Sequence, residues 1–184
     1  MTKKELRAEV RSRLNELTYA YKSESSKKIS ELVLLTDEYK NADSIFIYSS
    51  SVNEPDTSAV IERAFADGKR VYVPKCISRG IMVPVRIDRD TQYEQGYMGI
   101  REPVFYDEGI SLSEIDLSVI PCMSAATDGS RLGHGAGFYD IFLSKTGTYK
   151  LCLCFRELLC ERIPTDAHDI KMDCIITENG IFRA

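Results

Sequence analysis

The stretch Asp128–Asp140 reads Asp-Gly-Ser-Arg-Leu-Gly-His-Gly-Ala-Gly-Phe-Tyr-Asp, and the rest of the chain is organised around it. Its four glycines, Gly129, Gly133, Gly135 and Gly137, fall within nine residues. Glycine permits positive φ and lets a ligand approach the main chain closely. Successive free N–H groups in such a loop form a cradle for anions, above all phosphate. The stretch therefore predicts an anion-binding loop.

The residues around the glycines add to this interpretation. Arg131 brings a forked, permanent positive charge that matches phosphate oxygens. Residues 138–143 look helical, and a helix N-terminus favours anions, while Asp140 is suited to hold a magnesium ion that bridges phosphates. The spacing is not a P-loop, because no Gly-Lys-Ser/Thr follows, and the glycines run G-x-G-x-G, unlike the dinucleotide fingerprint. A plain connecting loop is the alternative that the residues alone leave open.

Length and composition describe an ordinary globular protein. The 184 residues suffice for one domain, residues 1–184, with a full core. The net charge of −4 argues against a nucleic-acid partner. The sequence shows no apolar run of transmembrane length, and its charged start lacks the pattern of a signal peptide. We therefore expect a cytoplasmic protein with no membrane partner.

The cysteines are expected to be reduced thiols. None of the six lies in a C-x-x-C pair, and only two histidines could complete a four-ligand zinc site. Buried, reduced side chains are typical of such cysteines in a chain without a secretory signal.

Apolar residues at every third or fourth position predict one helix over residues 3–21. Its other faces carry Lys3, Lys4 and Arg7 near the start. A solvated basic face and a face directed at a polyphosphate are both open interpretations of these charges.

Further along the chain, helices and strands alternate. A second helix is expected after residues 23–26 with Tyr39 on its inner side, and a third from Asp56 or Thr57 to about Asp67. Strands are expected at residues 44–48, 70–74, 81–87, 116–121, 149–155 and 172–177. Alternation of this kind indicates an α/β fold with a mostly parallel sheet and helices on its faces.

Two loops are candidates for ligand contact. Glu54 follows the strand at 44–48, and ligands gather at the carboxyl ends of strands in open α/β sheets; without that topology it is a loop acid. Residues 88–110 show no periodicity and are expected to form a partly ordered excursion that covers a site. Its aromatic and methionine side chains either line a flat ligand or anchor the loop: Tyr93, Tyr97, Met98 and Phe105.

Several short motifs occur in a fixed order along the whole chain. They are Lys-Lys-Glu-Leu-Arg at 3–7, Asn-Glu-Pro-Asp-Thr at 53–57, Pro-Lys at 74–75, Gly-Ile-Arg-Glu-Pro at 99–103, the glycine stretch at 129–140, Ile-Pro at 163–164, His-Asp at 168–169 and Asp-Cys-Ile-Ile-Thr-Glu-Asn-Gly at 173–180. In type and order these motifs resemble the 5-formyltetrahydrofolate cyclo-ligase family.

The resemblance implies a fold and a reaction. The fold would be a single-domain, three-layer α/β/α sandwich. In the reaction ATP phosphorylates the formyl oxygen of 5-formyltetrahydrofolate, N10 attacks the activated carbon, and loss of phosphate leaves 5,10-methenyltetrahydrofolate, with Mg²⁺ required. The partners implied are these two small molecules, and we expect a monomer, with a dimer as the alternative.

The resemblance also assigns roles residue by residue. ATP-binding roles fall on Lys3, Lys4, Glu5, Leu6, Arg7, Arg131, Leu132, Gly133, His134, Gly135, Ala136, Gly137, Phe138 and Tyr139. Substrate-binding roles fall on Ser49, Glu54, His134, Gly135, Ala136, Gly137 and Phe138. The metal ligands would be Asp140 and Asp169, and the catalytic side chains Arg131 and His134.

Chemistry is consistent with these roles. Phosphoryl transfer is mostly positioning and charge neutralisation, which cations and backbone N–H groups supply. Glu54 can accept hydrogen bonds from the N–H donors of a pterin. Because the substrate brings its own nucleophile, N10, no nucleophilic side chain is expected.

Blander interpretations stay open for single residues. Asp140 would be a helix-surface acid, Asp169 the cap of a turn and His134 a solvent-exposed side chain. Lys75 would be a surface lysine at a strand end if it does not contact a phosphate or the folate tail. Two other functions compete: a small-molecule kinase with a different substrate, and a protein that binds the folate without turnover.

Overall fold

The computed structural model describes residues 1–78, 80–96, 99–106 and 110–184. Two residues expected to line a ligand, Tyr97 and Met98, lie outside this part of the chain. Nearly all buried apolar side chains of the described residues form one core cluster, which extends from the first helix to the last buried strand. Among the described residues, no helix has the length and apolarity needed to cross a membrane.

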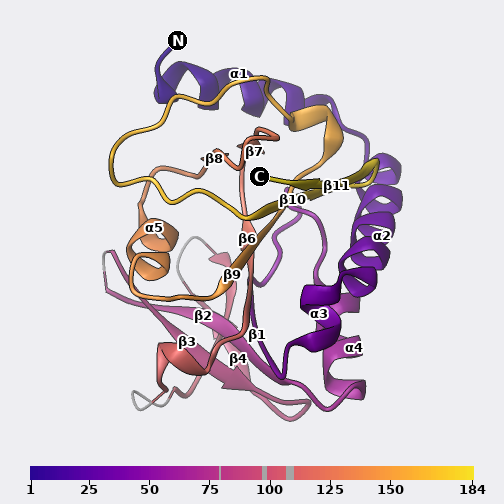
Figure 1. The fold of residues 1–184 in the computed structure, drawn as a ribbon, viewed down its shortest axis with the longest axis vertical. Coiled ribbons are helices and arrows are strands. Elements are labelled where there is room, and N and C mark those ends of the chain that lie inside the picture. Colours follow the sequence, from indigo (N-terminus) through magenta and orange to yellow (C-terminus); the bar gives the residue numbers. More distant parts are fainter. Residues whose placement is uncertain (79, 97–98, 107–109) are drawn as a thin grey trace.

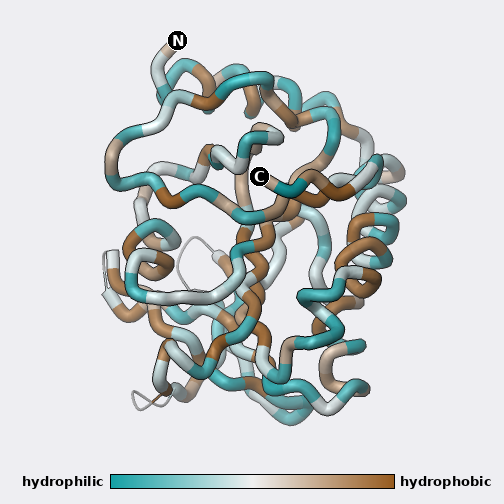
Figure 2. The backbone as a smooth tube through the Cα atoms, viewed as in Figure 1, coloured by the Kyte–Doolittle hydropathy of each residue, from teal (hydrophilic) through white to brown (hydrophobic). Residues whose placement is uncertain are grey.

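A seven-stranded sheet forms the middle of the molecule, in the order β11-β10-β9-β6-β1-β2-β3 (Figure 1). The five inner strands are parallel, and the two edge strands β3 and β11 are antiparallel to their neighbours. The bounds are β1 Ser44–Ile47, β2 Arg70–Ser78, β3 Ile81–Ile87, β6 Leu117–Pro121, β9 Tyr149–Leu153, β10 Cys174–Thr177 and β11 Gly180–Arg183. All residues of β1, β6 and β10 are buried, as expected for strands covered on both faces. Figure 2 shows mostly hydrophobic residues along these central strands.

Helices cover both faces of the sheet. They are α1 Lys3–Glu16, α2 Tyr19–Leu35, α3 Asp37–Asn41, α4 Ser58–Ala66 and α5 Phe138–Leu143, with 3₁₀ turns η2 Leu112–Glu114 and η3 Arg156–Leu158. In Figure 1, α2, α3 and α4 lie on one side of the sheet, α5 lies on the other, and α1 crosses one end of the molecule. Helix α5 contacts β3, while α2 contacts β10 and α4 contacts β2. This arrangement confirms the predicted three-layer α/β/α sandwich.

The prediction of one helix over residues 3–21 is wrong. Leu17 is extended, with φ −71° and ψ 122°, and the hydroxyl of Thr18 accepts the N–H of Tyr21 to begin α2. The second helix therefore starts earlier than expected and ends before Tyr39, which belongs to α3. Thr36 separates these helices in the same way, because its hydroxyl accepts the N–H of Tyr39. A threonine hydroxyl at an N-cap starts a new helix and so ends the preceding one. The spacing of apolar residues does not reveal such caps.

The excursion at 88–110 contains a small hairpin of β4 Tyr93–Gln95 and β5 Arg101–Pro103. It is fastened to β2, which runs further than the predicted 70–74. Lys75, with a side chain 10% exposed, donates to the carbonyl of Pro103 at 2.5 Å and pairs with Glu94 at 2.9 Å. The alternative that made Lys75 a surface residue at a strand end is therefore wrong.

The glycine stretch leaves the sheet as a second small hairpin, β7 Ser124–Ala125 with β8 Arg131–Leu132. Gly129 turns it with φ 84°, and a Cβ there would collide with the carbonyl of Met172. After β8 the chain runs through half-buried Gly133 and exposed residues 134–137 into α5, as predicted. The six cysteines are free thiols, as expected; the expected burial is confirmed for four of them, whereas Cys76 and Cys160 are half-buried.

Candidate active site

Four segments meet where the parallel strands end. They are the start of α1, residues 48–57 after β1, the glycine stretch, and residues 164–172 before β10. Figure 1 shows α1 crossing the end of the molecule at which β7 and β8 lie. Carboxyl ends of parallel strands are where α/β proteins collect ligands. The topology that the interpretation of Glu54 required is therefore present.

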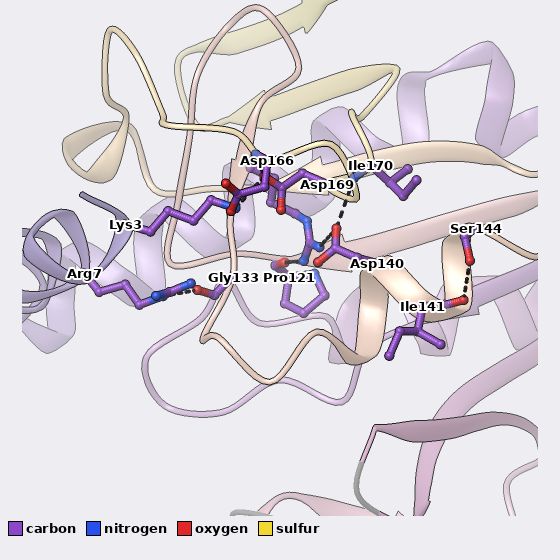
Figure 3. A network of polar contacts seen from close by, with 11 residues as sticks. Lys3, Arg7, Pro121, Gly133, Asp140, Ile141, Ser144, Asp166, Asp169 and Ile170 are labelled. Carbon is purple, nitrogen blue, oxygen red and sulfur yellow. Dashed lines mark hydrogen bonds and ion pairs between the residues drawn. The ribbon is translucent and has the colours of Figure 1, made fainter. Parts of the chain in front are cut away.

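The start of α1 lies against the glycine stretch. A capping box between Thr2 and Glu5 begins the helix, which places Lys3 and Arg7 one turn apart on one face. Arg7 Nε donates to the carbonyl of Gly133 at 2.8 Å (Figure 3). At Gly135, where φ is 103°, a Cβ would stand 3.3 Å from Arg7 Cζ. The glycine thus gives the guanidinium room to approach the main chain.

Lys3 reaches the loop before β10. Its Nζ lies 2.5 Å from Asp169 Oδ2 and 2.8 Å from Asp166 Oδ2. Burial would lower the pKa of Lys3, but hydrogen bonds to the two carboxylates raise it above its ordinary value. For Asp169, burial would raise the pKa, but the hydrogen bonds from Lys3 and from the Asp166 N–H lower it. The three side chains therefore form a charged cluster at the edge of the site.

Arg131 is directed into the protein. Its side chain is 4% exposed and donates to Asp140 Oδ1 at 2.9 Å and to the carbonyl of Pro121 at 3.3 Å. The N–H of Ile170 donates to the same Asp140 oxygen at 3.2 Å. Arg131 Nε is buried and has no partner among the described residues. Arg131, which was predicted to bind phosphate, therefore uses its guanidinium to bond protein groups. Together with the N–H of Ile170 it holds Asp140 in place.

Glu54 faces the glycine stretch from the other side. Its carboxylate is 7% exposed; Oε2 accepts the N–H of Ser51 at 2.9 Å, and Oε1 lies 3.6 Å from His134 Nε2. Thr57 holds this loop to the end of β1 by donating its hydroxyl to the carbonyl of Tyr48 at 2.8 Å. Glu54 is therefore a buried acid aimed at the site, whereas His134 is half exposed.

Tyr139 lies in the same neighbourhood. Burial, and next the negative charge of Glu54, raise the pKa of its phenol, and the Arg131 guanidinium lies 5.7 Å from its ring centroid. Phe142, one turn along α5, stacks on Phe46 of β1 with 4.4 Å between ring centroids. This stacking fixes α5, and with it Asp140, against the sheet.

Other predicted residues take up different places. Leu6 and Leu132 are core side chains, so only their backbone can face a ligand. Lys4, Glu5, Gly135, Ala136 and Gly137 are exposed, and Ser49 is half-buried in the loop of Glu54. The metal-ligand prediction paired Asp140 with Asp169. The structure places Asp169 nearest to Asp166 and His168 and links Asp140 to the same loop through the N–H of Ile170.

The carboxylates suit a hard divalent cation. Ligand atoms of Asp166, His168 and Asp169 lie within 4.8 Å of one another. Carboxylate oxygens are the ligands that Mg²⁺ prefers, and the ammonium of Lys3 already occupies a cation position between two of them. The two aspartates of this set therefore fit Mg²⁺, whereas imidazole, as in His168, is more typical of zinc and other transition metals. Asp166 was missed from the sequence, although its spacing of three from Asp169 is the signal of a turn that brings two acids together.

A family model described as the 5-formyltetrahydrofolate cyclo-ligase family matches residues 1–178. The chain belongs to this family. A 5-formyltetrahydrofolate cyclo-ligase of Mus musculus is 29% identical over 97% of this chain and 94% of its own length. A probable 5-formyltetrahydrofolate cyclo-ligase of Schizosaccharomyces pombe is 30% identical over 100% of this chain and 98% of its own. The resemblance inferred from the motifs is thereby confirmed for a family of ligases.

Solved structures agree with the fold. The NMR structure of a 5,10-methenyltetrahydrofolate synthetase of Aquifex aeolicus superposes with a TM-score of 0.87 at 27% identity, covering 100% of this chain and 93% of that one. A 5,10-methenyltetrahydrofolate synthetase of Mycoplasma pneumoniae gives 0.75 at 24% identity, covering 97% and 99%, and supports the fold alone.

Proposed function

We propose that this chain converts 5-formyltetrahydrofolate to 5,10-methenyltetrahydrofolate with ATP and Mg²⁺, and releases ADP and phosphate. The observation that carries the proposal is that one glycine loop lies between a cationic helix face and a buried carboxylate. Arg7 lies against this loop on one side, and Glu54 faces it across His134 on the other. Two ligands bound on the two sides would meet at the loop, as transfer between them requires.

The ATP phosphates would lie along residues 133–137. Backbone N–H groups of the exposed glycines would donate to phosphate oxygens. Arg7 and Lys3 would add positive charge from α1, which the capping box holds in place. Their charges would oppose the negative charge that phosphoryl transfer concentrates on the γ-phosphate.

The pterin would bind at Glu54. The carboxylate is buried, and its nearest protein partners are one N–H group and a histidine 3.6 Å away. A buried charge with so few donors is costly, and the N–H groups of a pterin would supply more. His134 would then lie between Glu54 and the phosphates, where we propose that it faces the reacting formyl group.

Mg²⁺ would be held by Asp140, Asp166 and Asp169, and would neutralise phosphate charge and polarise the phosphoryl oxygens. Arg131 acts through Asp140. Its two hydrogen bonds fix the carboxylate and the last residue of β6 as one unit. We therefore propose a positioning role for Arg131 in place of direct phosphate contact.

The chemistry balances without a nucleophile from the protein. The formyl oxygen attacks the γ-phosphorus and ADP leaves. N10 then attacks the formyl carbon and loses its proton, and the oxygen departs with phosphate. The protein has to align ATP with the formyl group and to exclude water from the activated intermediate.

An absorbance assay tests this proposal. Purified protein is mixed with 5-formyltetrahydrofolate, Mg²⁺ and ATP, and the near-ultraviolet band of the methenyl product is followed. We expect a band that rises only when both ATP and Mg²⁺ are present. ATP binding without a band would favour a kinase of another substrate, and folate binding without ATP turnover would favour sequestration.

A further inference from the structure

Lys3 lies where two proposed metal ligands converge. Its Nζ is 2.5 Å from Asp169 Oδ2 and 2.8 Å from Asp166 Oδ2, as the cluster in Figure 3 shows. The N–H of Asp166 donates to the same Asp169 oxygen at 2.6 Å, which closes the turn that brings both acids together. One ammonium therefore compensates two carboxylates.

The two site cations that pair with aspartates, Lys3 and Arg131, differ in freedom. Arg131 is 4% exposed and bonded to both Asp140 and Pro121, so its position is fixed. Lys3 is 19% exposed and stands in the first turn of α1, on a side chain with four rotatable bonds. Of these two, Lys3 can change partners without a rearrangement of the core, and Arg131 cannot.

We propose that Lys3 is an intramolecular counter-cation that keeps Asp166 and Asp169 from taking up free divalent metal until nucleotide phosphates draw its ammonium away. The inference rests on the proposed function, because it takes ATP and Mg²⁺ as the ligands of this site. It makes metal binding and nucleotide binding depend on each other.

In the proposed exchange the ammonium of Lys3 moves from the two carboxylates to phosphate, and a divalent cation takes its place, so no charge is left unpaired. Arg7, one turn along α1, already touches the glycine stretch, so phosphates there come within reach of the same helix face. Phosphate oxygens are as good acceptors for an ammonium as carboxylates are. Once Lys3 pairs with phosphate, Asp166 and Asp169 are free for a divalent cation. By linkage, nucleotide must then raise metal affinity and metal must raise nucleotide affinity by the same factor.

A purely structural ion pair would behave differently. It would tie α1 to residues 164–172, and its loss would lower thermal stability without a change in metal affinity. Metal binding in the absence of nucleotide therefore separates the two roles.

The experiment measures Mn²⁺ binding without nucleotide, from the electron paramagnetic resonance signal of the free ion. Lys3→Met removes the ammonium and keeps the length of the side chain. Lys27→Met, at an exposed position of α2, is the matched control for the loss of one positive charge. We expect Lys3→Met to raise Mn²⁺ affinity on the order of tenfold, because two carboxylates lose their cation. Lys27→Met should leave it unchanged, and Lys3→Arg should keep it low.

A second titration measures the coupling directly. A non-hydrolysable ATP analogue is bound calorimetrically in EDTA and in excess Mg²⁺. The ratio of the two affinities should be large in the wild type and several-fold smaller in Lys3→Met.

Unchanged Mn²⁺ affinity in a folded Lys3→Met protein would overturn the inference, and so would a rise of equal size in Lys3→Arg. The methenyl assay of the wild type keeps the two proposals separate. If the wild type forms product and Lys3→Met binds Mn²⁺ as the wild type does, the counter-cation role alone is refuted. If the wild type forms no product, the proposed reaction is refuted. The difference in Mn²⁺ affinity between wild type and Lys3→Met then still shows whether Lys3 competes with metal.

Discussion

The two halves of the site differ in how their carboxylates are paired: one half pairs them with cations, and the other does not. In the proposed nucleotide half, which comprises the start of α1, the glycine stretch and residues 164–172, half-buried carboxylates meet cations: Asp140 meets Arg131 at 2.9 Å and Asp169 meets Lys3 at 2.5 Å. In the proposed folate half, residues 48–57, Glu54 is more deeply buried, with 7% of its side chain exposed against 20% for Asp140 and 16% for Asp169. It has one backbone N–H at 2.9 Å and a histidine at 3.6 Å that is cationic only when protonated.

The difference shows how each half can respond to a ligand. A compensated pair is already satisfied, so a ligand there must exchange partners with it, and removal of one member leaves the other unpaired. A buried carboxylate with few donors is itself an attraction for N–H groups. Variants of the first half should therefore disturb the protein itself, whereas variants of the second should mainly change folate binding.

Arg131→Ala should have the largest effect. It leaves Asp140 without its cation and frees the end of β6, so turnover should fall about a hundredfold to a thousandfold and unfolding should become easier by about 3 kcal/mol. Steady-state kinetics and urea denaturation measure the two. Asp140→Asn and the double variant complete a cycle, and additive effects in that cycle would contradict the coupling of the pair.

Glu54→Gln should have the next largest effect. The amide keeps the shape but loses the charge that pterin N–H groups would bond, so KM for the folate should rise about tenfold to a hundredfold. Binding of ATP and thermal stability should stay near wild type. If folate KM and turnover were both unchanged, the assignment of the pterin to this half would fail.

Gly135→Ala should have a smaller effect than Glu54→Gln, and it should affect ATP more than folate. The new Cβ meets a positive φ of 103° and the Arg7 guanidinium at 3.3 Å, a strain of about 1–3 kcal/mol. We expect KM for ATP to rise about tenfold and KM for folate to change less. Gly147→Ala is the control, because a Cβ there has no neighbour within 4 Å. Equal effects of the two variants would argue against a special role for the loop.

Asp128→Asn should have the smallest effect, visible in acid. Hydrogen bonds from Lys171 and Ser130 lower the pKa of Asp128 to about 2. Because its pKa in the unfolded chain is about 3.9, the stabilisation is present above that value and is lost as the pH falls toward 2. The difference in free energy of unfolding between wild type and variant should therefore shrink from about pH 6 to about pH 3. A constant difference would show that the carboxylate charge contributes nothing there.

The sequence predicted the sheet because buried parallel strands are short apolar runs, and it located Glu54 because the end of such a run marks the carboxyl edge. It missed the break at Leu17, since the apolar spacing continues through a threonine cap. It also did not indicate that the Arg131 guanidinium bonds to Asp140 and Pro121. The turn from β7 into β8, beside which that guanidinium is buried, packs its Gly129 against Met172, a residue 43 positions further along that no local pattern indicates.

The partners of Lys3 were beyond sequence reasoning for the same reason. Asp169 lies 166 positions from Lys3, and only the fold brings the ends of the chain together. The motifs named Lys3 and Asp169 separately as ligand residues. Their direct contact, and the presence of Asp166 beside them, required the structure.

The fate of one oxygen atom tests directly whether ATP phosphorylates the formyl group. 5-Formyltetrahydrofolate labelled with ¹⁸O in the formyl group is turned over with ATP and Mg²⁺, and the released phosphate is analysed by mass spectrometry. Phosphorylation of the formyl oxygen predicts one ¹⁸O in each phosphate released. Unlabelled phosphate, with methenyl product formed, would rule out phosphorylation of the formyl oxygen, because the oxygen would then have left by another route.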